Sequence, residues 1–126
     1  MARSKRASDE LYNARRRVRR AAEAGRLFRE QPFILGVPLG EVDPAHQESR
    51  ETVLVQGIID LYFEEDGKLI LVDYKTDRVA DPVELAKRYR VQLLYYRRAL
   101  EQSTGKPVSE TYLYSTVFRQ CLKIEE

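Results

Sequence analysis

The sequence predicts a single α/β domain in which two helices flank a mixed β-sheet of four to five strands. Helical apolar spacing at 8–24 and 81–103 alternates with extended apolar runs, in the order helix, three strands, helix, one or two strands. A length of 126 residues suits one compact core. Hydrophobic residues make up 43% and charged residues 33%, as in a globular chain rather than a disordered one.

Positive charge is concentrated in the first predicted helix. Residues 1–29 hold ten Lys or Arg and three acidic residues, a net charge of +7, whereas residues 30–126 carry −5. Ser8 is the predicted N-cap and Gly25 the end of the helix. The candidate DNA-binding side chains of this basic arm are Arg15, Arg16, Arg19 and Arg20. A solvated helix face, or a helix that packs on a larger protein, is the alternative, and charge alone favours that alternative.

Three extended segments follow the helix. Residues 27–39 alternate apolar side chains, and Pro32 within them indicates an edge strand. Residues 40–50 are polar and are predicted to form a loop. The apolar run 53–63 predicts a strand covered on both faces. Glu64-Glu65-Asp66-Gly67 predicts a hairpin turn, and residues 68–74 form the returning strand.

The second helix has clear signals at both ends. Asp81 is a predicted N-cap, Pro82 takes the first helical position, and Gly105 ends the helix. Residues 108–115 predict a further strand, and 117–124 a short last one.

Composition also excludes several classes of protein. No run approaches the roughly 20 apolar residues of a membrane span, and we expect no secretory signal and no membrane partner. The one cysteine, Cys121, rules out an internal disulfide and Cys-based zinc or iron–sulfur sites within this chain. We therefore expect a reducing, cytoplasmic setting. Because Gly105-Lys106 precedes Pro107, no phosphate-binding loop is formed and ATP hydrolysis by this chain alone is not expected.

Two carboxylates interrupt neighbouring apolar strands. Asp60 lies within the run 53–63, and Asp73 directly follows the apolar strand before it, where a buried carboxylate is costly without a partner. Both are six residues from the Asp66-Gly67 turn, so antiparallel pairing sets them nearly opposite each other. Lys75 points to the same face as Asp73 because strand side chains alternate.

This set of side chains suits metal-assisted hydrolysis of a phosphodiester. A hard cation such as Mg²⁺ removes the repulsion between two carboxylates and binds through one or two of them plus waters. Lys75 offers a compact positive charge to the phosphate or to the attacking water. A structural Asp–Lys ion pair at a strand end is the alternative, and the spacing alone leaves both open.

The second helix favours the active-site interpretation. Gln92 falls in the middle of its apolar stripe, beside Tyr96, and an amide there needs hydrogen-bond partners. A site at the strand ends would supply them. An amide satisfied by a backbone carbonyl, with Tyr96 in the core, is the alternative.

Three motifs occur in the order and spacing of a known family. Gly57–Asp60, Asp73–Asp77 and Gln92–Tyr96 resemble the GxxD, DYKTD and QxxxY motifs of the RecB-type nucleases in the PD-(D/E)XK superfamily. Residues 29–33, 55–61 and 108–115 are further similar to the C-terminal nuclease domains of AddA-type helicase–nucleases. The likeness covers most of residues 20–116 and implies a restriction-endonuclease-like sheet.

The resemblance also implies roles for individual residues. Asp60 and Asp73 would bind Mg²⁺, which Mn²⁺ could replace, together with the Tyr74 backbone carbonyl, and Glu30 is a further candidate ligand. Lys75 would be the catalytic lysine. Gln92 and Tyr96 would hold the DNA end or orient the site.

The expected protein is a metal-dependent deoxyribonuclease, an exonuclease domain acting in double-strand-break repair by recombination. Residues 1–25 would be its basic helix and 27–126 its core, excised from a larger chain. Its partners would be a DNA single strand or duplex end, the helicase portion of the parent chain and an AddB-like protein. A catalytically silent DNA-binding or scaffolding module and a stand-alone RecB-type exonuclease are the alternatives.

The sequence departs from the family at one position. The family's usual metal-binding His, on a helix before the first strand, has no counterpart in residues 8–24, and the only His of the chain, His46, falls in the predicted loop. We therefore expect His46 to be exposed and the isolated domain to be a weak or inactive nuclease.

Overall fold

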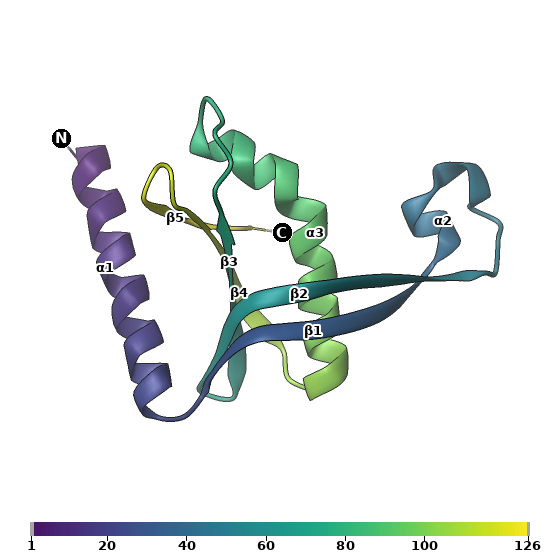
Figure 1. Cartoon of the computed structure of the whole chain (residues 1–126), viewed down its shortest axis with the longest axis horizontal. Helices are drawn as coiled ribbons and strands as arrows, with labels where there is room; N and C mark the ends of the chain where they lie inside the picture. Colours follow the sequence, from purple (N-terminus) through teal and green to yellow (C-terminus); the bar gives the residue numbers. More distant parts are fainter. Residues whose placement is uncertain (1, 126) are drawn as a thin grey trace.

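A computed structural model places the chain in two helical layers around one sheet (Figure 1). It describes residues 2–125, and the side chains of residues 9–125. The sheet has five strands in the order β1-β2-β3-β4-β5. The strands are β1 (Leu27–Pro38), β2 (Thr52–Glu65), β3 (Lys68–Lys75), β4 (Val108–Ser115) and β5 (Gln120–Lys123). Neighbouring strands are antiparallel except β3 and β4, which are parallel, and this confirms the predicted mixed sheet.

The two long helices cover opposite faces of the sheet (Figure 1). They are α1 (Ala2–Glu23) and α3 (Pro82–Thr104). The core under α1 consists of Ala21, Leu61, Phe63, Ile70 and Val72. The core under α3 includes Ile59, Leu71, Leu85, Leu93, Leu100 and Leu113. In the described part of the chain, no helix has both the length and the apolar character to cross a bilayer.

Local sequence signals account for most element boundaries. The Asp81 carboxylate accepts a hydrogen bond from the Val83 N–H at 2.9 Å, and Gly105 ends α3 with φ of 73°. The β2–β3 turn has positive φ at both Asp66 and Gly67, the geometry that tight hairpins favour. The prediction that Ser8 caps the first helix is wrong. That helix begins at Ala2, because residues 2–7 contain no Gly or Pro to stop it.

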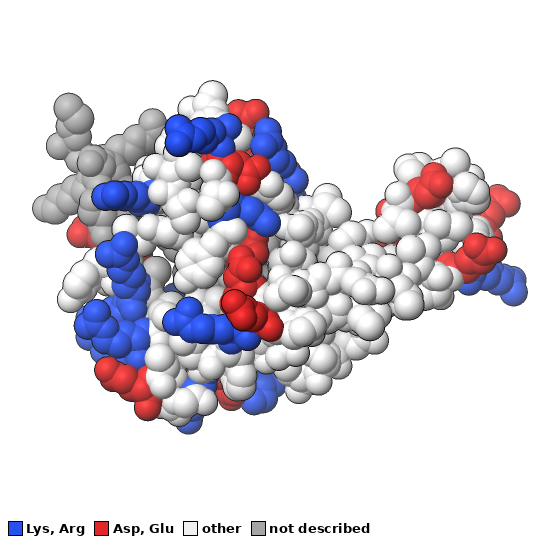
Figure 2. Space-filling view, in the orientation of Figure 1, with Lys and Arg blue, Asp and Glu red and all other residues white. Residues whose placement is uncertain are grey.

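The first half of β2 leaves the sheet together with β1. β2 pairs with β3 only over 61–65, while it pairs with β1 over most of its length. Residues 52–59 therefore form a two-stranded arm with β1 (Figure 1). The predicted burial of this stretch on both faces is wrong, since Leu54 is 62% and Ile58 57% exposed. Figure 2 shows this arm mostly without charge.

The end of the arm is more ordered than the predicted loop. It carries the short helices α2 (Leu39–Val42) and η1 (Pro44–His46). His46 is exposed, and its Nδ1 lies 2.8 Å from the Asp43 carboxylate. Since η1 lies at the tip of the arm, His46 is remote from the region where β2 and β3 part (Figure 1).

Candidate active site

Asp60 and Asp73 lie where β2 and β3 part. The last pair between these strands is Leu61 with Val72, so the two aspartates are the next residues outward, level with each other. The Tyr74 backbone N–H donates a hydrogen bond of 3.0 Å to the Asp60 carboxylate. This bond bridges the opening between the strands and holds the two carboxylates side by side.

Asp73 is a buried carboxylate with an incomplete set of hydrogen bonds. Its residue is 2% exposed, and its Oδ2 has no hydrogen bond of good geometry although the Lys75 Nζ lies 2.9 Å away. Burial raises the pKa of Asp73 to about 6, and the neighbouring Asp60 raises it further against the opposing effect of Lys75. A cation at this carboxylate pair would relieve both the burial cost and the repulsion.

Lys75 connects β3 to α3. Its ammonium lies 2.9 Å from the Asp73 carboxylate and donates a 2.9 Å hydrogen bond to the Gln92 side-chain oxygen. Gln92 is thus satisfied by Lys75, as a site at the strand ends requires. The sequence pattern identified both residues but could not show that they contact each other.

Tyr96 lies beside the carboxylate pair, on the α3 face of the sheet. Its ring meets Phe33 of β1 edge to face, with centroids 5.1 Å apart. Burial raises the pKa of Tyr96, and the charges of Asp73 and Asp60 add to the effect. Gly57 leaves room for this arrangement, because a Cβ there would lie 2.7 Å from Phe33 Cε1 and 3.4 Å from Tyr96 Cε1.

The donor set at this position suits Mg²⁺. Magnesium keeps several waters and needs only one or two protein carboxylates, which Asp60 and Asp73 provide. Glu30 is exposed and lies level with Asp60 in β1, with φ of 50°. Among the described residues no three His, Cys, Asp or Glu side chains form a metal-binding group, so Glu30 does not join the carboxylate pair in this structure.

The arginines of α1 divide into one structural residue and an exposed surface. Arg17 donates hydrogen bonds of 3.1 and 3.2 Å to Glu65 and also pairs with Glu110. The other four form no ion pair with any described residue and are exposed, as the blue side chains over α1 in Figure 2 show. We call these four the α1 arginine surface: Arg15, Arg16, Arg19 and Arg20.

Sequence reasoning missed the part played by Asp77 and Tyr89. The Tyr89 hydroxyl donates a 2.6 Å hydrogen bond to the Asp77 carboxylate, which also accepts a 3.1 Å bond from Arg88. The Lys75 ammonium lies 4.1 Å from the centre of the Tyr89 ring. Asp77 belongs to the DYKTD motif, and this was the one signal that could have drawn attention to it.

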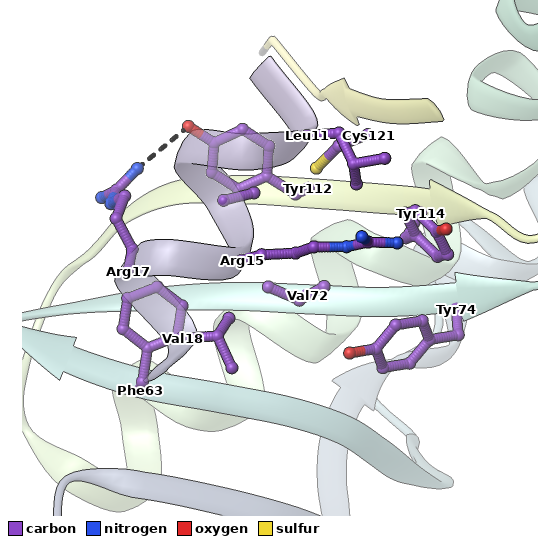
Figure 3. Close-up of a pocket in the computed structure, with 11 residues that line it drawn as sticks. Leu11, Arg15, Arg17, Val18, Phe63, Val72, Tyr74, Tyr112, Tyr114 and Cys121 are labelled. Atoms are coloured by element: carbon purple, nitrogen blue, oxygen red, sulfur yellow. Dashed lines mark hydrogen bonds between the residues drawn. The ribbon is translucent and has the colours of Figure 1, made fainter. Parts of the chain in front are cut away.

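A separate cavity of about 310 Å³ lies between α1 and the sheet (Figure 3). Tyr74, Tyr112 and Tyr114 line it with Cys121 and Arg15 (Figure 3). Tyr74 alternates with its neighbours in β3, so it faces α1 whereas Asp73 and Lys75 face α3. No carboxylate lines this cavity, and we therefore place the candidate active site at the parting of β2 and β3.

Comparisons with known proteins agree with this geometry. Residues 2–120 match the family model described as the PD-(D/E)XK nuclease superfamily. An ATP-dependent helicase/nuclease of the AddA type from Clostridium kluyveri is 48% identical over 98 residues, which cover 75% of this chain and 8% of the relative. Its namesake in Lachnoclostridium phytofermentans is 38% identical over 140 residues, covering 84% and 10%. The chain thus spans about a tenth or less of the length of these relatives.

Proposed function

The chain belongs to the PD-(D/E)XK nuclease superfamily, and we propose that it is a Mg²⁺-dependent DNA nuclease domain that hydrolyses phosphodiester bonds. One observation carries the proposal: Asp60, Asp73 and Lys75 converge where two strands part. A structural ion pair alone would not need the second carboxylate, which makes Asp73 harder to ionise.

The carboxylates of Asp60 and Asp73 would hold the metal, together with the Tyr74 backbone carbonyl. Glu30 is a further candidate ligand. When bound, the metal lowers the pKa of a coordinated water and stabilises negative charge on the phosphate. The Tyr74 N–H keeps the Asp60 carboxylate turned toward Asp73, so the pair is already arranged before any ligand arrives.

Lys75 would supply positive charge to the reacting phosphate. Its ammonium contacts Asp73, so a phosphate beside the carboxylate pair comes within its reach. Gln92 fixes the direction of the Lys75 side chain from α3. Tyr96 packs against Phe33 and closes the apolar wall of the site, so we assign it a role in orienting the DNA end.

We propose that the α1 arginine surface contacts the DNA backbone. Its four guanidinium groups have no carboxylate partner among the described residues and are free to neutralise phosphates. Backbone contacts carry no base sequence, so the binding is sequence-independent.

We also propose that this domain serves a larger helicase–nuclease in the cytoplasm that processes double-strand breaks for recombinational repair with an AddB-like protein. The similarity to two proteins that carry the name ATP-dependent helicase/nuclease supports this assignment. In such an enzyme the helicase presents the DNA end to the site, a positioning effect that the isolated domain lacks. We expect the 126-residue chain alone to be a weak nuclease.

The test compares metal binding and cleavage in two variants. Asp73→Ala should abolish Mg²⁺-dependent cleavage of linear DNA by the complete helicase–nuclease and weaken Mg²⁺ binding measured by calorimetry on the chain. Lys75→Ala should retain Mg²⁺ binding but lose cleavage. Asp9→Ala and Lys87→Ala, matched changes at exposed positions, should behave like the parent.

Cleavage that survives Asp73→Ala or Lys75→Ala would overturn the proposed site. DNA binding without any cleavage in Mg²⁺ or Mn²⁺, by the complete enzyme, would instead identify a silent DNA-binding module.

A further inference from the structure

The ammonium of Lys75 is surrounded on three sides. The Asp73 carboxylate and the Gln92 side-chain oxygen each lie 2.9 Å from Nζ, and the Tyr89 ring faces it at 4.1 Å. An ammonium has three N–H donors, and these three neighbours match that number. The ring face offers a negative electrostatic surface to a cation at this distance.

The Tyr89 ring is itself fixed from β3. Its hydroxyl donates a 2.6 Å hydrogen bond to the Asp77 carboxylate, and Arg88 donates a 3.1 Å bond to the same oxygen. Asp77 comes two residues after Lys75, just past the end of β3. The chain therefore turns back from the strand end to hold the ring that covers its own lysine.

We propose that Asp77 and Tyr89 form a positioning pair that holds the Lys75 ammonium in its reactive place. The inference rests on the proposed role of Lys75 and deepens it. Asp73 is the one charged neighbour of Lys75, and a carboxylate that shares its charge with a cation holds the ammonium less firmly. The Tyr89 ring and Gln92 carry no net charge to share, so they keep the lysine placed when Asp73 is engaged elsewhere.

Lysine-selective ¹³C NMR on the metal-free chain tests the placement without any need for activity. A proton over a ring face is shifted upfield, so the Lys75 ε-methylene signal should be displaced in the parent protein. Tyr89→Leu should remove that displacement. Tyr89→Phe keeps the ring and should preserve most of it, with broadening because the anchor to Asp77 is lost.

Single-turnover cleavage of linear DNA in Mn²⁺, with protein in excess, measures the consequence for the reaction. Tyr89→Leu should lower the maximal rate about tenfold, and Tyr89→Phe and Asp77→Asn about threefold each. The DNA concentration at half-maximal rate should stay unchanged, since Lys75 acts on the reacting phosphate. Tyr12→Leu, an exposed tyrosine on α1, is the matched control.

The outcomes separate this inference from the proposed function. An unshifted Lys75 signal in the parent, or one that Tyr89→Leu leaves in place, would overturn the positioning role. If Lys75→Ala cleaves normally while Tyr89→Leu still moves the lysine signal, the positioning pair stands and the proposed chemistry of Lys75 fails. Equal rate losses in Tyr89→Phe and Tyr89→Leu would show that the hydroxyl, not the ring face, matters, and would also refute the inference. Thermal unfolding of each variant verifies that it folds.

Discussion

Removing the charge of Asp73 should stabilise the metal-free fold. Asp73 is 2% exposed and lies beside a second carboxylate, which is an unfavourable place for a negative charge. Asp73→Asn keeps the size of the side chain and removes the charge. We therefore expect this variant to lose cleavage while gaining resistance to unfolding.

The magnitude follows from the pKa of Asp73, which rises from 3.8 to about 6 in the fold. Because the folded state holds its proton more tightly than the unfolded chain, the fold loses stability as the pH rises through this interval. The loss is absent well below pH 3.8 and complete above pH 6 or so, where it amounts to about 3 kcal/mol. Asp73→Asn avoids it, so the gain should be about 3 kcal/mol at pH 8 and about half as much at pH 5.

Urea unfolding in EDTA at pH 8 and pH 5 gives the free energy of unfolding of both proteins. Added Mg²⁺ should then stabilise the parent and leave Asp73→Asn nearly unchanged, since a ligand stabilises only the fold that binds it. Asp66→Asn, a matched change at the exposed β2–β3 turn, should have little effect at either pH. A variant no more stable than the parent at pH 8 would refute the reasoning, and so would a gain that does not shrink at pH 5.

Three further predictions concern the fold and the DNA surface. Arg17→Ala should lower the free energy of unfolding by about 2 kcal/mol because two half-buried carboxylates lose their partner, whereas Arg16→Ala, an exposed change, should cost under about 0.5 kcal/mol; urea denaturation distinguishes them. Gly57→Ala should cost about 2 kcal/mol in the same assay, since its Cβ would lie 2.7 Å from Phe33; an unchanged midpoint would contradict this packing. DNA binding should weaken steeply with salt and equally for unrelated sequences, and replacing all four residues of the α1 arginine surface by Gln should flatten the slope of log K against log salt, measured by fluorescence anisotropy.

Much of the fold could be predicted from the sequence because its signals are local. Pro82 and Gly105 mark the ends of α3 through backbone geometry that no distant contact has to supply. The turn at Gly67 fixes the register of β2 and β3, and that register sets Asp60 level with Asp73. The spacing of two acidic residues about one turn was therefore enough to expect a carboxylate pair.

The rest depended on contacts between segments far apart in the chain. Periodicity shows that Leu54 is apolar but cannot show that β3 has turned away and left it exposed. Likewise, nothing in the spacing of Lys75, Asp77 and Tyr89 reveals that the ring lies over the ammonium, because the angle at which α3 crosses the sheet decides it. Local propensity and alternation by themselves determined the elements and the carboxylate pair; only the packing of α3 on the sheet decided which side chains surround that pair, since such contacts depend on the relative placement of elements that no local rule fixes.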